Sequence, residues 1–200
     1  IPVCSQTGVG CTELLDLATR AFPSPPEHPS PEVFTPAGAP AGDISCDPEG
    51  PLVAEVIKTT TDPYIGRLSL VRVFSGTLRS DDSVHVSGHF SSFFGDGTGH
   101  PDHDEDEKIG SLSHPFGKLQ APADQVVAGD ICAIGRLSRA ETGDTLSDIG
   151  DPRVLKPWSM PEPLLPIAVV ARSKADEDKL SQALSRLAAE DPSLRVENNA

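Results

Sequence analysis

The sequence predicts a mainly β protein: a small antiparallel barrel with one helix before it and a β-α-β segment after it. In the middle of the chain, short runs alternate apolar with polar residues and are separated by turn residues, a pattern typical of antiparallel strands. Near each end, apolar residues recur at helical spacing instead. With 20 Pro, 17 Gly and only 4% aromatic residues, the composition fits a loop-rich fold with an aliphatic core.

Residues 1–27 are expected to form a turn and a helix. Leu14 and Ala18 lie on one face at helical spacing, and the helix should end at Pro23, because proline removes a backbone donor. A helix this short cannot bury its apolar face alone. The next residues, 28–50, are rich in proline and lack apolar periodicity, so we expect a linker or extended arm there.

Residues 51–150 carry the alternating pattern of the barrel. Its expected strands cover residues 52–57, 68–74, 84–86, 126–127 and 131–134. Short strands joined by turns, with no helical pattern between them, favour a closed or nearly closed antiparallel barrel.

Residues 87–107 interrupt this pattern with serines, glycines, histidines and acids. No position there looks apolar enough for the core, so we expect a long loop. Residues 151–163 are expected to be a second linker.

Residues 164–200 have the pattern of a strand, a helix and a second strand. The first strand is expected at 164–171 and the second at 194–196, with a capping box from Ser173 to Asp176 at the start of the helix. This is the first half of an α/β sandwich. Without partners for its sheet edge, it should be loosely ordered or self-associate.

The net charge and the spacing of the cysteines argue against some classes of protein. The net charge of −14 argues against a free-standing nucleic-acid binder. From Arg153 onward, however, seven basic residues balance seven acidic ones. None of the four cysteines forms a Cys-x-x-Cys pair, which favours reduced thiols and a cytoplasmic location. No apolar run is long enough to span a membrane.

Two motifs resemble ligand sites, and both have simpler explanations. Gly8-Val9-Gly10 precedes a helix, but no Gly-Lys-Ser or Gly-Lys-Thr follows, so a phosphate loop is not predicted. Residues 100–107 combine histidines with carboxylates; such a run usually stays solvated, and we predict no metal site. No nucleophile-histidine-acid arrangement stands out. The chain itself is therefore not expected to be an enzyme.

Several motifs in order resemble elongation factor G. Residues 61–68, 72–78, 128–131 and 142–146 look like its second domain. The segments 160–163, 174–176 and 187–196 look like the start of its third, ferredoxin-like domain. Phe22-Pro23-Ser24-Pro25 is similar to the end of the last helix of its GTP-binding domain. We therefore expect an internal piece of a larger protein, without the residues that bind nucleotide.

The resemblance implies a parent that is a cytoplasmic translational GTPase acting on the ribosome in protein synthesis. GTP and magnesium would bind in the preceding domain, and none would bind in this chain. The barrel would relay the nucleotide state between domains. The implied partners are ribosomal RNA and protein, and the parent's own GTP-binding domain; no membrane is implied.

Five basic residues are candidates for interdomain or ribosome contacts. Arg67 and Arg72 lie five apart on one expected strand, so their side chains should leave it on opposite faces. The other three flank or lie on the C-terminal helix and are candidates for a phosphate-facing patch. They are Arg172, Lys174 and Arg186.

One region departs from the family. Elongation factor G usually has a short basic connection where this chain has the acidic residues 87–107. A less basic barrel should attract ribosomal RNA less strongly, which favours a divergent paralogue. The alternative function is a protein-binding adaptor, in which the barrel and the acidic segment bind another protein without translocase activity.

Overall fold

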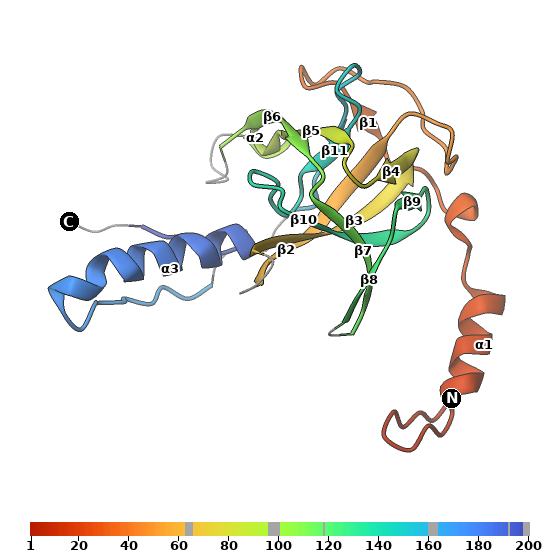
Figure 1. The fold of residues 1–200 in the computed structure, drawn as a ribbon, viewed down its shortest axis with the longest axis horizontal. Coiled ribbons are helices and arrows are strands. Elements are labelled where there is room, and N and C mark those ends of the chain that lie inside the picture. The colour runs from red at the N-terminus through yellow and green to blue at the C-terminus, as the bar shows by residue number, and fades with distance from the viewer. Residues whose placement is uncertain (63–65, 96–100, 118, 160–163, 192, 198–200) are drawn as a thin grey trace.

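The computed structural model describes residues 1–62, 66–95, 101–117, 119–159, 164–191 and 193–197. A curled β sheet lies at the centre, with helix α1 on one side and helix α3 on the other (Figure 1). The helical elements are α1 (Cys11–Ala21), η1 (Pro25–Glu27), α2 (Phe90–Phe94), η3 (Lys174–Asp176) and α3 (Glu177–Glu190). The strands are β1 (Val33–Phe34), β2 (Val53–Asp62), β3 (Gly66–Ser75), β4 (Thr77–Arg79), β5 (Ser83–Gly88), β6 (His103–Lys108), β7 (Ser111–Phe116), β8 (Leu119–Pro122), β9 (Gln125–Val127), β10 (Ile131–Gly135), β11 (Thr145–Ser147) and β12 (Val154–Leu155).

The main sheet has eight strands in the order β6-β5-β11-β2-β3-β10-β7-β8, all paired antiparallel. The two-residue link Ile109-Gly110 joins β6 near one edge to β7 near the other, and the Gly110 N–H donates to Gly135 O at 3.3 Å. The sheet therefore curls into a barrel, with β4 and β9 as a separate pair. The prediction of a mainly β, barrel-like antiparallel fold with an N-terminal helix is confirmed.

The barrel core comes from the inward face of each strand. Along β3, Val71 and Val73 are fully buried and alternate with half-buried residues, as the period of two requires. Ile134 of β10 and Leu146 of β11 are also fully buried. Each such side chain stabilises the fold by about 1.5–3 kcal/mol.

Each of the segments expected as linkers, 28–50 and 151–163, contributes a short strand that packs beside the barrel. Strand β1 pairs with β12, with Val33 opposite Leu155. These two side chains and Ile44 are buried in a second small core. The sequence did not indicate this packing, because few apolar residues of these segments reach the barrel. In addition, β12, the partner strand of β1, lies far away in the sequence.

The expected long loop at 87–107 is wrong for most of its length. Residues 103–108 form β6, which pairs with β5 along six positions, and Phe90 of α2 is buried. Tertiary pairing here overrides the low strand propensity of acidic residues. Because β6 is an edge strand, its carboxylates remain exposed while its backbone pairs. Residues 96–100, also in the expected loop, lie outside the described residues.

At the C-terminus, α3 forms as expected, but the two flanking strands do not. Residues 164–171 and 194–196 carry no strand pairing, and Leu164 and Ile167 are 91% and 81% exposed. A strand needs a hydrogen-bonded neighbour, and none of the described residues supplies one. No helix among the described residues is long and apolar enough to cross a membrane.

Candidate functional site

The N-terminal arm meets the barrel through a short capped turn. After α1, residues 25–27 form η1, and Ser24 caps this turn: its N–H and its hydroxyl both donate to Glu27 Oε2, at 2.8 and 2.7 Å. These bonds favour the carboxylate and lower the pKa of Glu27. The turn therefore has a defined shape of its own where the chain passes from helix to barrel.

Gly129 permits the close contact between this turn and the barrel. Its φ is +93°, and a Cβ there would lie 2.8 Å from the Cβ of Pro25 and 3.1 Å from the Sγ of Cys46. Its N–H donates to Val73 O at 2.8 Å, which fixes the turn before β10 against β3. Only glycine satisfies both the conformation and the space.

Arg72 lies on the outer face of β3, beside this contact. Its guanidinium carbon is 4.8 Å from the centre of the Phe74 ring, a cation–π geometry. Across the strand pair it faces Glu55 of β2. Burial raises the pKa of Glu55 to about 7, and the Arg72 charge offsets part of that effect. Arg72 is therefore held by neighbours on its own sheet.

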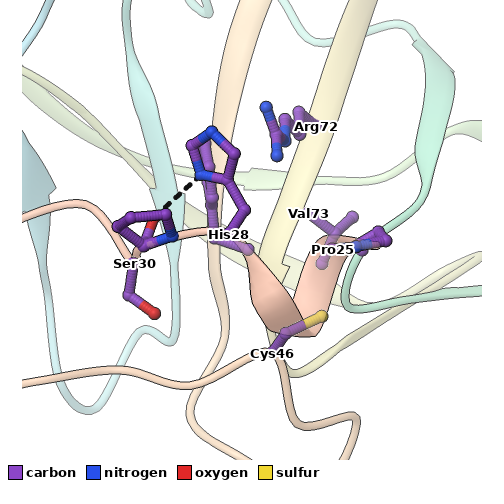
Figure 2. Close-up of a pocket in the computed structure, with 9 residues that line it drawn as sticks. Pro25, His28, Ser30, Cys46, Arg72 and Val73 are labelled. Atoms are coloured by element: carbon purple, nitrogen blue, oxygen red, sulfur yellow. Dashed lines mark hydrogen bonds between the residues drawn. The ribbon is translucent and has the colours of Figure 1, made fainter. Parts of the chain in front are cut away.

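Figure 2 shows the small pocket where these parts meet, with Arg72 and Val73 beside the strand and Pro25 and His28 on the arm. Its volume is about 20 Å³, room for about one water molecule. The pocket is too small for a cofactor or substrate. The arrangement is a joint between arm and barrel, which we call the arm joint: residues 24–30, Cys46, Arg72–Phe74 and Gly129.

A second joint connects the barrel to α3. The carboxylate Oε1 of Glu190, at the end of α3, accepts a hydrogen bond of 2.9 Å from the Thr61 N–H at the end of β2. In Figure 1 the end of α3 lies against the tip of β2. The N-terminal arm and α3 therefore contact the barrel at two separate places.

Arg67 has a local structural contact. Its Nη1 donates to Ser138 O at 2.6 Å and to Ala140 O at 3.3 Å. It therefore holds the loop between β10 and β11 against β3. Burial alternates along β3, which places Arg67 and Arg72 on opposite faces of the strand.

Arg172, Lys174 and Arg186 are all exposed, but they do not form one compact patch. Arg186 lies nine residues into α3, about 14 Å along the axis from its first residue. That exceeds a Debye length of about 10 Å. Acidic residues fill the first turn of α3, and Asp176 pairs with Lys179 at 3.4 Å. The local field is therefore mixed in sign.

The turn before α1 requires glycine. At Gly10, which precedes α1 with φ +74°, a Cβ would lie 2.0 Å from Pro2 O. Glu13 in the first turn of α1 makes this helix N-terminus less favourable for an anion. Among the described residues, no group of three or more metal-ligating side chains is placed to hold a metal.

Sequence reasoning missed the arm residues of the joint and a histidine–carboxylate cluster on β5 and β6. Pro25 and His28 looked like linker residues, because their contacts lie far away in the sequence. The pairing of His85 with Asp104 has no local pattern in the sequence. The spacing of Asp104 and Asp106 could only have indicated that both carboxylates lie on one face of a strand.

Comparison with protein families identifies two matching regions. The model described as Elongation factor G domain 2 matches residues 51–149. The model described as Elongation Factor G, domain III, matches residues 160–200. The two matches occur in the same order as the motifs.

Known relatives agree with these matches. An elongation factor G-like protein of Mycobacterium tuberculosis, found in two strains, is 72% identical over the whole chain, and the elongation factor G of Salinibacter ruber is 38% identical over 94% of it. The chain spans only 28% and 25% of the length of these proteins. A crystal structure from Thermus thermophilus matches 96% of the chain with a TM-score of 0.67 and 25% identity, and the chain covers 24% of it. The chain therefore belongs to the elongation factor G family.

Proposed function

We propose that this chain is the middle region of a cytoplasmic elongation factor G-like GTPase that acts on the ribosome in protein synthesis. Residues 1–27 would be the end of its GTP-binding domain, 51–150 its second domain and 164–200 the start of its third. The succession of the two family matches carries this proposal. By the likeness to elongation factor G relatives, GTP and magnesium would bind in the preceding domain.

In this proposal the barrel is a non-catalytic relay. The arm joint would transmit movement of the GTP-binding domain to β3, because Pro25 of the capped turn packs closely against Gly129. The contact between Glu190 and Thr61 would pass that movement to the third domain. A barrel with a well-packed core moves as a rigid body, which suits it to this role.

The candidate basic residues take different parts in this proposal. Arg72 would hold the interdomain contact at the arm joint, because it lines the pocket beside His28. Arg172, Lys174 and Arg186 would contact ribosomal phosphates, since they are exposed. Replacing each of these three residues with alanine should reduce the amount of protein that ribosomes retain. The retention should then also depend less steeply on the salt concentration. Replacing Arg79, an exposed barrel arginine, with alanine is the matched control.

The test is co-sedimentation of the full-length protein with ribosomes, in the presence of a non-hydrolysable GTP analogue or of GDP. Retention with the analogue and release with GDP is the expected result. Retention in neither state would contradict the ribosome role, while leaving the family membership intact. In that case the adaptor alternative, which the names of the relatives do not support, would be the function to examine.

A further inference from the structure

His85 of β5 stands between two carboxylates of β6. Its Nδ1 lies 2.6 Å from Asp106 Oδ1, and its Nε2 lies 3.2 Å from Asp104 Oδ1. An ionised carboxylate only accepts hydrogen bonds, and a neutral imidazole donates from one nitrogen only. Both contacts are satisfied at once only if the ring carries two protons. His85 therefore connects β5 to two carboxylates of β6.

His89, just before α2, makes one hydrogen-bonding contact with a carboxylate and lies at a longer distance from a second one. Its Nε2 lies 2.9 Å from Asp104 Oδ2 and its Nδ1 lies 3.9 Å from Asp102 Oδ2. Asp104 thus stands between two imidazole rings, and it also accepts a hydrogen bond of 2.8 Å from the Ser87 hydroxyl. Burial alone would raise the pKa of Asp104, but these hydrogen bonds and the charge of His89 outweigh burial and lower it.

His103 completes the cluster on the inner face of β6. Its Nε2 lies 3.0 Å from Asp144 Oδ2 and its Nδ1 lies 3.2 Å from Pro101 O. Asp144 is fully buried. Burial alone would disfavour a charged ring, but the hydrogen bond and the charge of Asp144 prevail and raise the pKa of His103 to about 9. Both of its ring nitrogens again face acceptors.

The charges around the three rings are mostly negative. The carboxylates that face them come from β6 and from the segments before β6 and before β11: Asp102, Asp104, Asp106, Glu141 and Asp144. The nearby arginine, Arg139, lies 3.9 Å from Glu105.

We propose that His85, His89 and His103 form a histidine clamp: their contacts with carboxylates hold α2 and β6 on the barrel, and loss of the His103 proton that faces Asp144 loosens this region. Each ring joins two parts of it. His85 connects β5 to β6, His89 connects the start of α2 to β6, and His103 connects β6 to the segment before β11. The clamp would be a pH-sensitive element in the region where the sequence departs from its family.

The direction of the pH effect follows from His103. A group whose pKa is higher in the folded state stabilises the fold fully below its unfolded pKa of about 6.5. That contribution disappears as the pH rises through about 9. The clamp should therefore be closed at neutral pH and loosen under alkaline conditions.

The first test is nitrogen-15 NMR of the histidine side chains of the 200-residue chain at neutral pH. Both ring nitrogens of His103 should be protonated. His114 on β7, which has one carboxylate neighbour at 3.7 Å, serves as the reference ring. A neutral tautomer at His103 would overturn the proton-dependent clamp.

The second test is amide hydrogen exchange at about pH 7 and about pH 9.5, on either side of the alkaline limit of the clamp. After correction for intrinsic rates, protection of the β5–β6 amides should fall about tenfold or more relative to the β2–β3 amides. His103→Gln should lower their protection already at neutral pH, whereas His114→Gln should not. Equal loss in both strand pairs would indicate global unfolding and would reject the clamp.

Discussion

The barrel and the C-terminal segment contain similar apolar runs, but these runs have opposite environments. Ile134 of β10 is fully buried, whereas Ile167 is 81% exposed. Both lie in β-branched, aliphatic stretches that predict strands. The difference is that β10 pairs with both β3 and β7, while residues 164–171 have no paired neighbour among the described residues. An apolar run thus shows that a segment can form a strand, and only a neighbouring strand makes it one.

The sharpest test of this comparison replaces the same residue type in each region. Ile134→Ala should lower the free energy of unfolding by about 2–5 kcal/mol, because it leaves a cavity in a packed core. Ile167→Ala should change it by less than about 0.5 kcal/mol. Urea unfolding followed by tryptophan fluorescence or circular dichroism measures both. A similar loss for both variants would mean that residues 164–171 are buried in solution.

The arm joint allows a second matched pair. Gly129 and Gly38 both have positive φ, at +93° and +82°, but a Cβ meets Pro25 only at Gly129 and nothing within 4 Å at Gly38. Gly38→Ala should therefore cost about 1 kcal/mol of unfolding free energy from backbone strain, and Gly129→Ala about 1–3 kcal/mol. The difference between their denaturation midpoints isolates the contact with the arm. Equal midpoints would contradict that contact.

The same contrast explains what the sequence could predict. The barrel strands were predictable because short stretches rich in apolar residues, such as residues 68–74, are bounded by turn residues. The arm was not, since Val33 and Ile44 are single apolar residues whose partners lie on β2 and β12. Strand β6 was not predicted from the sequence, because most of its residues are charged and point to solvent or to histidines. Residue pairs distant in sequence, such as His103 with Asp144, leave no local pattern.

Glu55 offers a pH test within the barrel. Its pKa in the folded state is about 7, above the unfolded value of about 4.3. The folded state therefore binds more protons between these values, and stability should fall as the pH rises through them. Glu55→Gln should remove this part of the pH dependence and raise stability at about pH 8 by about 1 kcal/mol. Unfolding midpoints at about pH 5 and about pH 8 measure it, with exposed Glu49→Gln as the control. An unchanged profile would contradict a buried, titrating Glu55.

The smallest effect is expected at the joint between the barrel and α3, where one hydrogen bond connects the two regions compared above. Glu190→Ala removes the acceptor for the Thr61 N–H. It should cost at most about 1 kcal/mol, yet speed hydrogen exchange at Thr61. Glu190→Gln keeps an acceptor oxygen and should restore most of the protection, whereas Glu177→Ala, at the opposite end of α3, should have no effect there. Because the barrel folds around its own core, α3 should detach in the alanine variant without loosening β2 beyond its tip. If protection fell along the whole of β2, the barrel would depend on the helix for its stability.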